Sequence, residues 1–176
     1  MPRALVLDAA RSRLTVRTRA TGLLARFAHD LELAAPLTGH ADLDGDAWSG
    51  ELRFPVAALE VVGVVKAGRV DASVLSRSDQ ADISKRMRDD AFRGASEVRV
   101  HAEGTTRDRA ALTITIGAKA ARVSVAFVTL EQDAGFAVNG RAPLSLKALG
   151  SREIKAPLGA FSVEDEIAVG FELFLA

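Results

Sequence analysis

The chain has 176 residues, with 23 Lys plus Arg against 23 Asp plus Glu and 48% apolar content. This length and composition predict one globular, water-soluble domain over residues 1–176. Because the formal net charge is zero, no cationic excess is available for a phosphate backbone, and we expect no nucleic-acid partner. Since cysteine is absent, a disulfide framework, a thiolate metal site and a cysteine nucleophile are excluded.

Targeting and membrane segments are not apparent in the sequence. The apolar runs are short and interrupted by charges, so we expect no membrane span, which would need roughly 18 apolar residues. Residues 1–13 lack the apolar block of a signal peptide. The predicted location is therefore the cytoplasm, and a periplasmic location would need a leader outside this sequence.

Most of the chain alternates apolar and polar residues with a period of 2, which predicts strands with one dry and one wet face. In residues 13–19, for example, Leu14, Val16 and Thr18 share one face and arginines the other. Such one-sided strands are typical of antiparallel sheet. The alternation recurs in residues 30–33, 48–54, 97–101, 112–116, 123–127, 136–138, 144–146 and 167–175.

Turn sequences separate these strands at the spacing typical of a sandwich or a barrel. Residues 61–73, interrupted by Gly63 and Gly68, predict an irregular connection instead of a strand. The predicted turns are Thr38-Gly39, residues 44–46, residues 103–105, residues 133–135, Asn139-Gly140 and residues 157–159.

One segment has a helical period. Ile83, Met87 and Ala91 recur four residues apart, which predicts a short amphipathic helix over residues 79–92. A short side-chain oxygen at the start and a glycine after the end are typical helix boundaries. The candidates are Ser78 or Asp79 for the N-cap and Gly94 for the stop.

Metal, cofactor and catalytic motifs are missing from the sequence. The three histidines have no metal-ligand spacing, and the glycines form neither a phosphate loop nor a dinucleotide-binding motif. Residues 40–46 alternate like a calcium loop, but Ala47 and Arg53 stand where that loop needs Gly and Glu, so we predict an acidic hairpin. No strained serine elbow is present. We therefore expect no metal, no cofactor and no enzymatic activity.

His29 is the most notable polar residue. Counting back by two from Leu31 places it on the inward face of its strand, where an imidazole needs a partner. A hydrogen bond to nearby backbone, a contact with a ligand headgroup and an acid/base role remain open. Asp30 cannot assist it directly, because neighbouring residues in a strand point to opposite faces.

The order of several segments resembles one family of bacterial barrel proteins. Residues 5–16 resemble its first strand, with Asp8 and Ser12, and residues 23–33 are similar to its F-x-H-D form, with Phe27, His29 and Asp30. Residues 76–92, 112–125, 143–150 and 161–173 resemble its helix, its strand-Gly-strand unit, its penultimate segment and its closing strand. This is the YceI-like family of lipocalin-like, polyisoprenoid-binding barrels.

The resemblance implies an all-β, antiparallel, lipocalin-like barrel of about eight strands with the helix near one end. It also implies non-enzymatic binding or transport of a polyisoprenoid, isoprenoid quinone or fatty-acyl lipid in an apolar channel, with His29 at the mouth. The predicted lining residues are Leu14, Val16, Leu31, Leu33, Leu52, Phe54, Val100, Ile114, Ile116, Val125, Phe127, Val138, Leu146, Val169 and Phe171.

Two alternatives remain at this point. A period of 2 is equally compatible with a filled barrel that serves as a protein-interaction or stress-response module without ligand. An enzyme that uses His29 ranks last. Because a closed barrel has no free edge, we expect any homodimer to use faces or loops.

Overall fold

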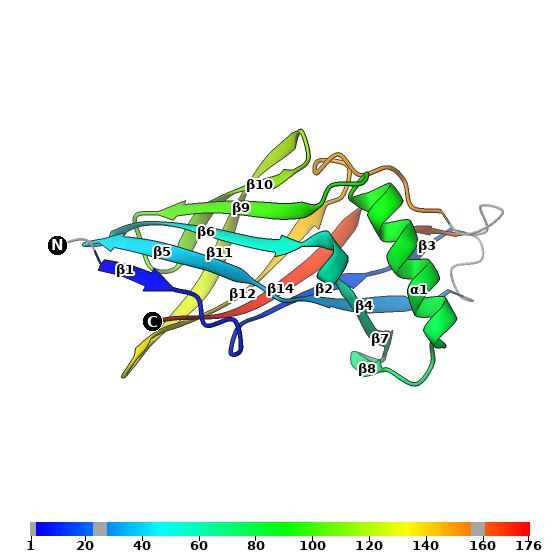
Figure 1. Ribbon diagram of the computed structural model, residues 1–176, viewed down its shortest axis with the longest axis horizontal. Coiled ribbons are helices and arrows are strands. Elements are labelled where there is room, and N and C mark those ends of the chain that lie inside the picture. Colours follow the sequence, from blue (N-terminus) through cyan, green and yellow to red (C-terminus); the bar gives the residue numbers. More distant parts are fainter. Residues whose placement is uncertain (1–2, 23–27, 156–160) are drawn as a thin grey trace.

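The computed structural model describes residues 3–22, 28–155 and 161–176. They form a curled antiparallel sheet with one short helix across one end (Figure 1). The strands are β1 (Arg3–Val6), β2 (Arg13–Thr18), β3 (Ala20–Thr21), β4 (Asp30–Ala35), β5 (Thr38–Asp44), β6 (Ala47–Pro55), β7 (Glu60–Lys66), β8 (Arg69–Asp71), β9 (Glu97–Gly104), β10 (Arg109–Ile116), β11 (Lys119–Gln132), β12 (Gly135–Ser145), β13 (Ser162–Val163) and β14 (Glu166–Leu175).

Twelve strands form one sheet in the order β1-β5-β6-β9-β10-β11-β12-β14-β2-β4-β7-β8, and β13 pairs with β3 separately. The end of β1 also reaches β14, because the Val6 N–H donates to Ala176 O at 2.8 Å and the Asp8 N–H donates to Phe174 O at 2.8 Å. The strands from β5 to β14 therefore curl into a cylinder that β1 closes. The predicted lipocalin-like antiparallel barrel with one short helix is confirmed, although its sheet has twelve strands.

Two local predictions, a turn at Thr38-Gly39 and an irregular connection over residues 61–73, were wrong. Residues 38–44, with a turn expected at Thr38-Gly39, form strand β5. Residues 60–71 form the hairpin β7–β8, in which Ala67 and Gly68 have φ of 48° and 79° and make the tight turn. Gly63 does not interrupt β7: a Cβ there would lie 2.6 Å from the carbonyl oxygen of Asp71, so this glycine allows the close approach of β8.

The predicted turn at Asn139-Gly140 lies inside β12, which runs without a break from Gly135 to Ser145. Gly140 pairs there with Phe171 of β14 and with Phe127 of β11. The glycine makes room for an aromatic ring on the inner face instead of turning the chain. The turn predicted at residues 157–159 lies outside the described residues.

The helix comprises α1 (Arg77–Arg86) and a π-helical turn, η3 (Met87–Ala91). It begins two residues earlier than predicted, because Ser76 is the N-cap. The Ser76 hydroxyl oxygen accepts from the Asp79 N–H at 3.1 Å, and the Asp79 carboxylate accepts from the Ser76 N–H at 3.0 Å. This reciprocal capping box fixes the start of the helix. After the helix, Gly94 adopts a φ of 76°, as expected of a residue that ends it.

Buried residues concentrate on the inner face of the cylinder, where Leu5 and Leu33 are almost completely buried. On the outer face, the buried carboxylate of Glu32 on β4 pairs with Nε of Arg17 on β2 at 2.7 Å. A buried carboxylate needs such a partner to offset the loss of hydration. None of the described helices is both long and apolar enough to cross a bilayer.

Candidate ligand-binding cavity

The inner faces of the strands surround a cavity of about 270 Å³. Its walls consist almost entirely of aliphatic and aromatic side chains, contributed by most strands of the cylinder and by η3. Every residue predicted to line the interior lies on this wall, except His29 and Leu31. The alternation of side chains along each strand therefore brings these residues together.

Strand register explains how the wall is assembled. Leu52 of β6 lies opposite Val100 of β9, which in turn lies opposite Ile114 of β10. On the other side, Val16 of β2 pairs with both Val169 of β14 and Leu33 of β4. Cross-strand partners point to the same face, so each such row adds a ring of apolar side chains around the cavity.

Partial exposure inside the cylinder shows that the interior is not completely filled. Phe54 and Ile114 are buried, whereas Leu52, Val100 and Phe171 point inward but remain partly exposed. Inward side chains keep accessible surface only where no neighbour packs against them. The barrel is therefore hollow, a point that the period of the sequence left open.

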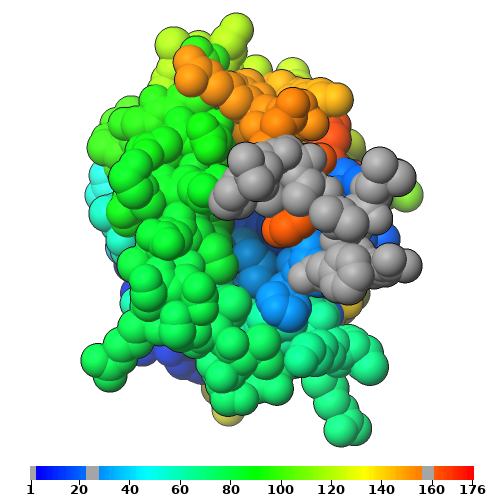
Figure 2. Space-filling view, turned by 90° about the vertical axis from the view of Figure 1, so that its right-hand side faces the viewer, coloured from blue at the N-terminus to red at the C-terminus, as the bar shows by residue number. Residues whose placement is uncertain are grey.

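At the helix end, Met87 and Ala91 of η3 and the following Phe92 lie on the cavity wall. Figure 2 looks at this end and shows a hollow beside the green surface of the helix. Hydrogen bonds connect the helix to the described part of the segment after β12. The Arg86 guanidinium donates to Lys155 O at 3.0 Å, and the Arg152 N–H donates to Asp90 O at 3.1 Å.

At the opposite end, aromatic rings narrow the cavity. Trp48 and Phe127 are in edge-to-face contact, with ring centroids 5.8 Å apart. The Trp48 indole N–H donates to Thr106 O at 2.8 Å, so its polar edge is satisfied while its ring lies on the wall. Phe136, Arg107 and Thr129 also belong to the wall at this end.

The structure corrects two predicted site residues. His29 is exposed and is not on the cavity wall. Its predicted inward position was wrong because β4 begins only at Asp30, so the strand's alternation does not extend to His29. Leu31 is half-buried on β4, beyond the register shift between Glu32 and Leu33, and it also lies off the wall.

Several wall residues were missing from the prediction. Leu5 and Leu43 come from strands β1 and β5, which the alternation analysis did not identify. Leu112, Leu144 and Leu173 belong to predicted strands, and alternation alone would have placed them inward.

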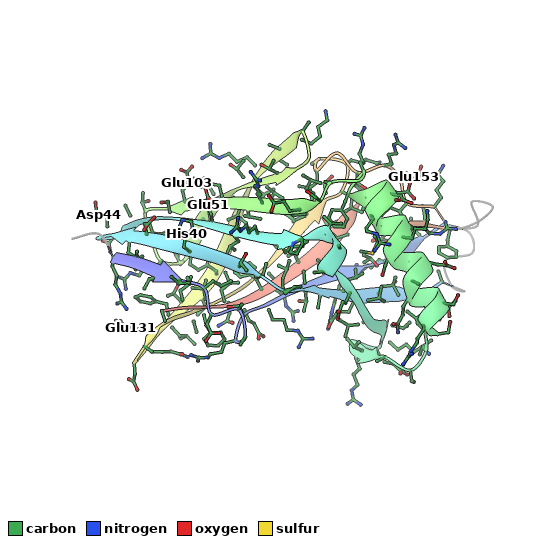
Figure 3. All side chains as sticks on the ribbon, in the orientation of Figure 1. His40, Asp44, Glu51, Glu103, Glu131 and Glu153 are labelled. Atoms are coloured by element: carbon green, nitrogen blue, oxygen red, sulfur yellow. The ribbon has the colours of Figure 1, made fainter. Side chains whose placement is uncertain are left out.

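A row of polar residues crosses strands β5, β6 and β9, and one of them, His40, also belongs to the cavity wall. His40, Glu51 and His101 are successive cross-strand partners, and their side chains are exposed. Figure 3 shows His40 and Glu51 on neighbouring strands β5 and β6. The described part of the chain holds no group of three acidic, histidine or cysteine side chains that could bind a metal ion.

One carboxylate with a perturbed pKa stabilises the turn after β12. The backbone N–H of Lys147 and the hydroxyl of Ser145 both donate to Asp165, at 2.8 and 2.7 Å. These bonds favour the ionised form, so they lower the pKa of Asp165 below its ordinary value. Asp165 is not on the wall, so this interaction supports the barrel end without facing a ligand.

Comparison with known proteins supports the fold. No family model and no curated protein matches the chain. The crystal structure of Burkholderia cenocepacia BcnA superposes with a TM-score of 0.66 over 97% of this chain and 99% of that chain. The two sequences are 15% identical. The chain therefore shares the lipocalin-like barrel architecture with BcnA.

Proposed function

We propose that this protein is a non-enzymatic carrier that binds one long apolar chain inside the barrel. The candidate ligands are a polyisoprenoid, an isoprenoid quinone or a fatty-acyl lipid. The observation that carries the proposal is the apolar cavity, whose wall extends from Phe92 beside the helix to Phe136 at the opposite end. An elongated apolar space suits a flexible chain better than a compact polar metabolite.

The chemistry of the wall disfavours water as the occupant. At a water's share of liquid volume, about 30 Å³, the cavity would hold on the order of ten molecules. A buried water needs two to four hydrogen-bond partners, and carbon-rich walls do not supply them. By contrast, a chain that buries about ten methylenes gains on the order of 8 kcal/mol before the cost of immobilising it.

Two further observations support a carrier. The segment order resembles the YceI-like family, and the fold is shared with BcnA. The wall presents mainly carbon atoms, whereas catalysis needs polar groups in mutual contact beside the substrate. The hollow interior also disfavours the alternative of a filled barrel without ligand.

Substitutions at Leu52 test the proposal, because this side chain points into the cavity from the middle of β6. Leu52→Trp fills part of the space, and Leu52→Arg adds a charge to the apolar wall. We expect Leu52→Trp to weaken uptake of a fluorescent fatty acid about tenfold, and Leu52→Arg to abolish it. The matched control is Val128→Arg, since Val128 is 60% exposed on the outer face of β11.

Circular dichroism would establish that each variant is folded before binding is measured. Folded Leu52 variants with wild-type affinity would show that the ligand does not occupy this cavity. If the wild-type protein takes up neither acyl nor polyprenyl lipids, the carrier proposal fails and an interaction module becomes the better interpretation.

A further inference from the structure

Two arginines surround one phenyl ring at the end of the cavity opposite the helix. The guanidinium carbon of Arg107 lies 5.5 Å from the ring centroid of Phe136, and that of Arg3 lies 5.8 Å from the same centroid. Both distances are within the range of cation–π attraction. We call Arg3, Arg107 and Phe136 the arginine rim.

Strand geometry and a loop contact explain why both guanidinium groups meet there. Leu5 of β1 is 1% exposed and points inward, so Arg3, two residues earlier, lies on the same face at the barrel's end. Arg107 belongs to the loop between β9 and β10, and its carbonyl oxygen accepts from the Thr129 hydroxyl at 2.7 Å. Phe136, on the inner face of β12, gives both arginines a common surface.

The arginine rim carries positive charge without an acidic partner. Neither Arg3 nor Arg107 has a carboxylate within 4.0 Å among residues 3–22, 28–155 and 161–176, whereas Arg122 pairs with Glu103 at 2.7 Å. The acid opposite Phe136 in the register is Glu131 on the exposed β11–β12 hairpin, and it forms no salt bridge with either arginine. Figure 3 shows Glu131 near the tip of that hairpin.

Several cations at the helix end have partners within the protein. Arg86 donates to Lys155 O, Lys85 pairs with Asp89 at 2.7 Å, and Lys155 pairs with Glu153 at 3.1 Å. None of these groups is on the cavity wall, where Arg107 is the one lysine, arginine or carboxylate among the described residues, so the two cavity ends differ in the charge that they offer a ligand.

From this asymmetry we infer that the arginine rim binds an anionic headgroup, a carboxylate or a phosphate, on the apolar chain of the ligand. The inference rests on the proposed function, since the chain must occupy the cavity for its headgroup to reach the rim. A guanidinium group presents N–H donors in a fixed fork that matches the oxygens of both anions. Stacking on Phe136 restrains the two guanidinium groups and leaves their N–H donors available for a ligand. The chain then extends from the rim toward the helix.

Matched ligand pairs test this inference with the full-length protein. Hexadecanoate is compared with hexadecanol, and farnesyl phosphate with farnesol, by calorimetry at low salt. We expect at least one anion to bind about tenfold more tightly than its alcohol, with a smaller preference at high salt because the site is exposed. The pair that shows the preference identifies carboxylate or phosphate.

Variants locate the headgroup site. The double variant Arg3→Gln/Arg107→Gln should lose the preference, so that each anion and its alcohol bind with the same affinity. Arg109→Gln is the matched control: it removes one positive charge at the same end, but Arg109 lies on the outer face of β10. This control should keep the preference, which would exclude a general effect of net charge.

The outcomes that contradict the inference are distinct from failure of the proposed function. Equal affinity for anion and alcohol in the wild-type protein would refute the headgroup site and leave apolar-chain binding intact. A preference that persists in the double variant would place the site elsewhere. If none of the four ligands binds, the proposed function and this inference both fail.

Discussion

Gly140 connects the stability of the barrel to the shape of its cavity. It lies on the inner face of β12 between Phe127 and Phe171, its partners on the two neighbouring strands. A Cβ at this position would lie 2.9 Å from Cε2 and 3.0 Å from Cε1 of Phe171. Gly140→Ala should therefore push the Phe171 ring away from the sheet and into the cavity.

The magnitude follows from two opposing effects. In a strand interior, alanine is favoured over glycine by about 0.5–1 kcal/mol, but overpacking costs about 1–3 kcal/mol. We predict that Gly140→Ala lowers the free energy of unfolding by about 1–2 kcal/mol. In a Phe171→Ala background the ring is absent, so the same substitution should stabilise the protein by about 0.5 kcal/mol.

Urea denaturation of the wild type, both single variants and the double variant measures this coupling. The displaced ring should also weaken uptake of a fluorescent fatty acid by Gly140→Ala. If Gly140→Ala is as stable as the wild type, or if the two substitutions act additively, the account of a ring seated on this glycine is wrong.

Two further predictions concern the turn after β12 and the start of the helix. Because hydrogen bonds from Lys147 and Ser145 lower the folded-state pKa of Asp165, its stabilising contribution is present above the unfolded pKa of about 3.8 and is lost as pH falls through the lowered value. Asp165→Asn should therefore make the unfolding free energy less dependent on pH below about 4, and an unchanged profile in urea titrations would contradict this. Ser76→Ala removes the N-cap of α1 and should lower the free energy of unfolding by about 1 kcal/mol. The first-turn amides, including that of Asp79, should then exchange hydrogen faster. Unchanged exchange would show that the cap is dispensable.

Sequence periodicity predicted the barrel wall well because each strand has one dry face. Leu52, Val100 and Ile114 are separated in sequence, yet alternation alone placed them on the inner side. The prediction failed where glycine has a tertiary role. Gly63 accommodates β8 and Gly140 accommodates Phe171, but both resemble chain breaks in the sequence.

Features that depend on three-dimensional assembly could not be predicted. The period of 2 does not report whether the side chains fill the interior, so the cavity had to come from the structure. His29 was misplaced because β4 begins only at Asp30, so the alternation of the strand could not be extended back to it. Arg3 and Arg107 are far apart in sequence, and only the closure of the barrel brings them to the same ring.

Native mass spectrometry of the purified wild-type protein, followed by lipid extraction and analysis, tests the central claim most directly. The account predicts a bound apolar chain at one per protein, or stoichiometric uptake when acyl or polyprenyl lipids are added. A protein that is purified without lipid and takes up none of those added would contradict it.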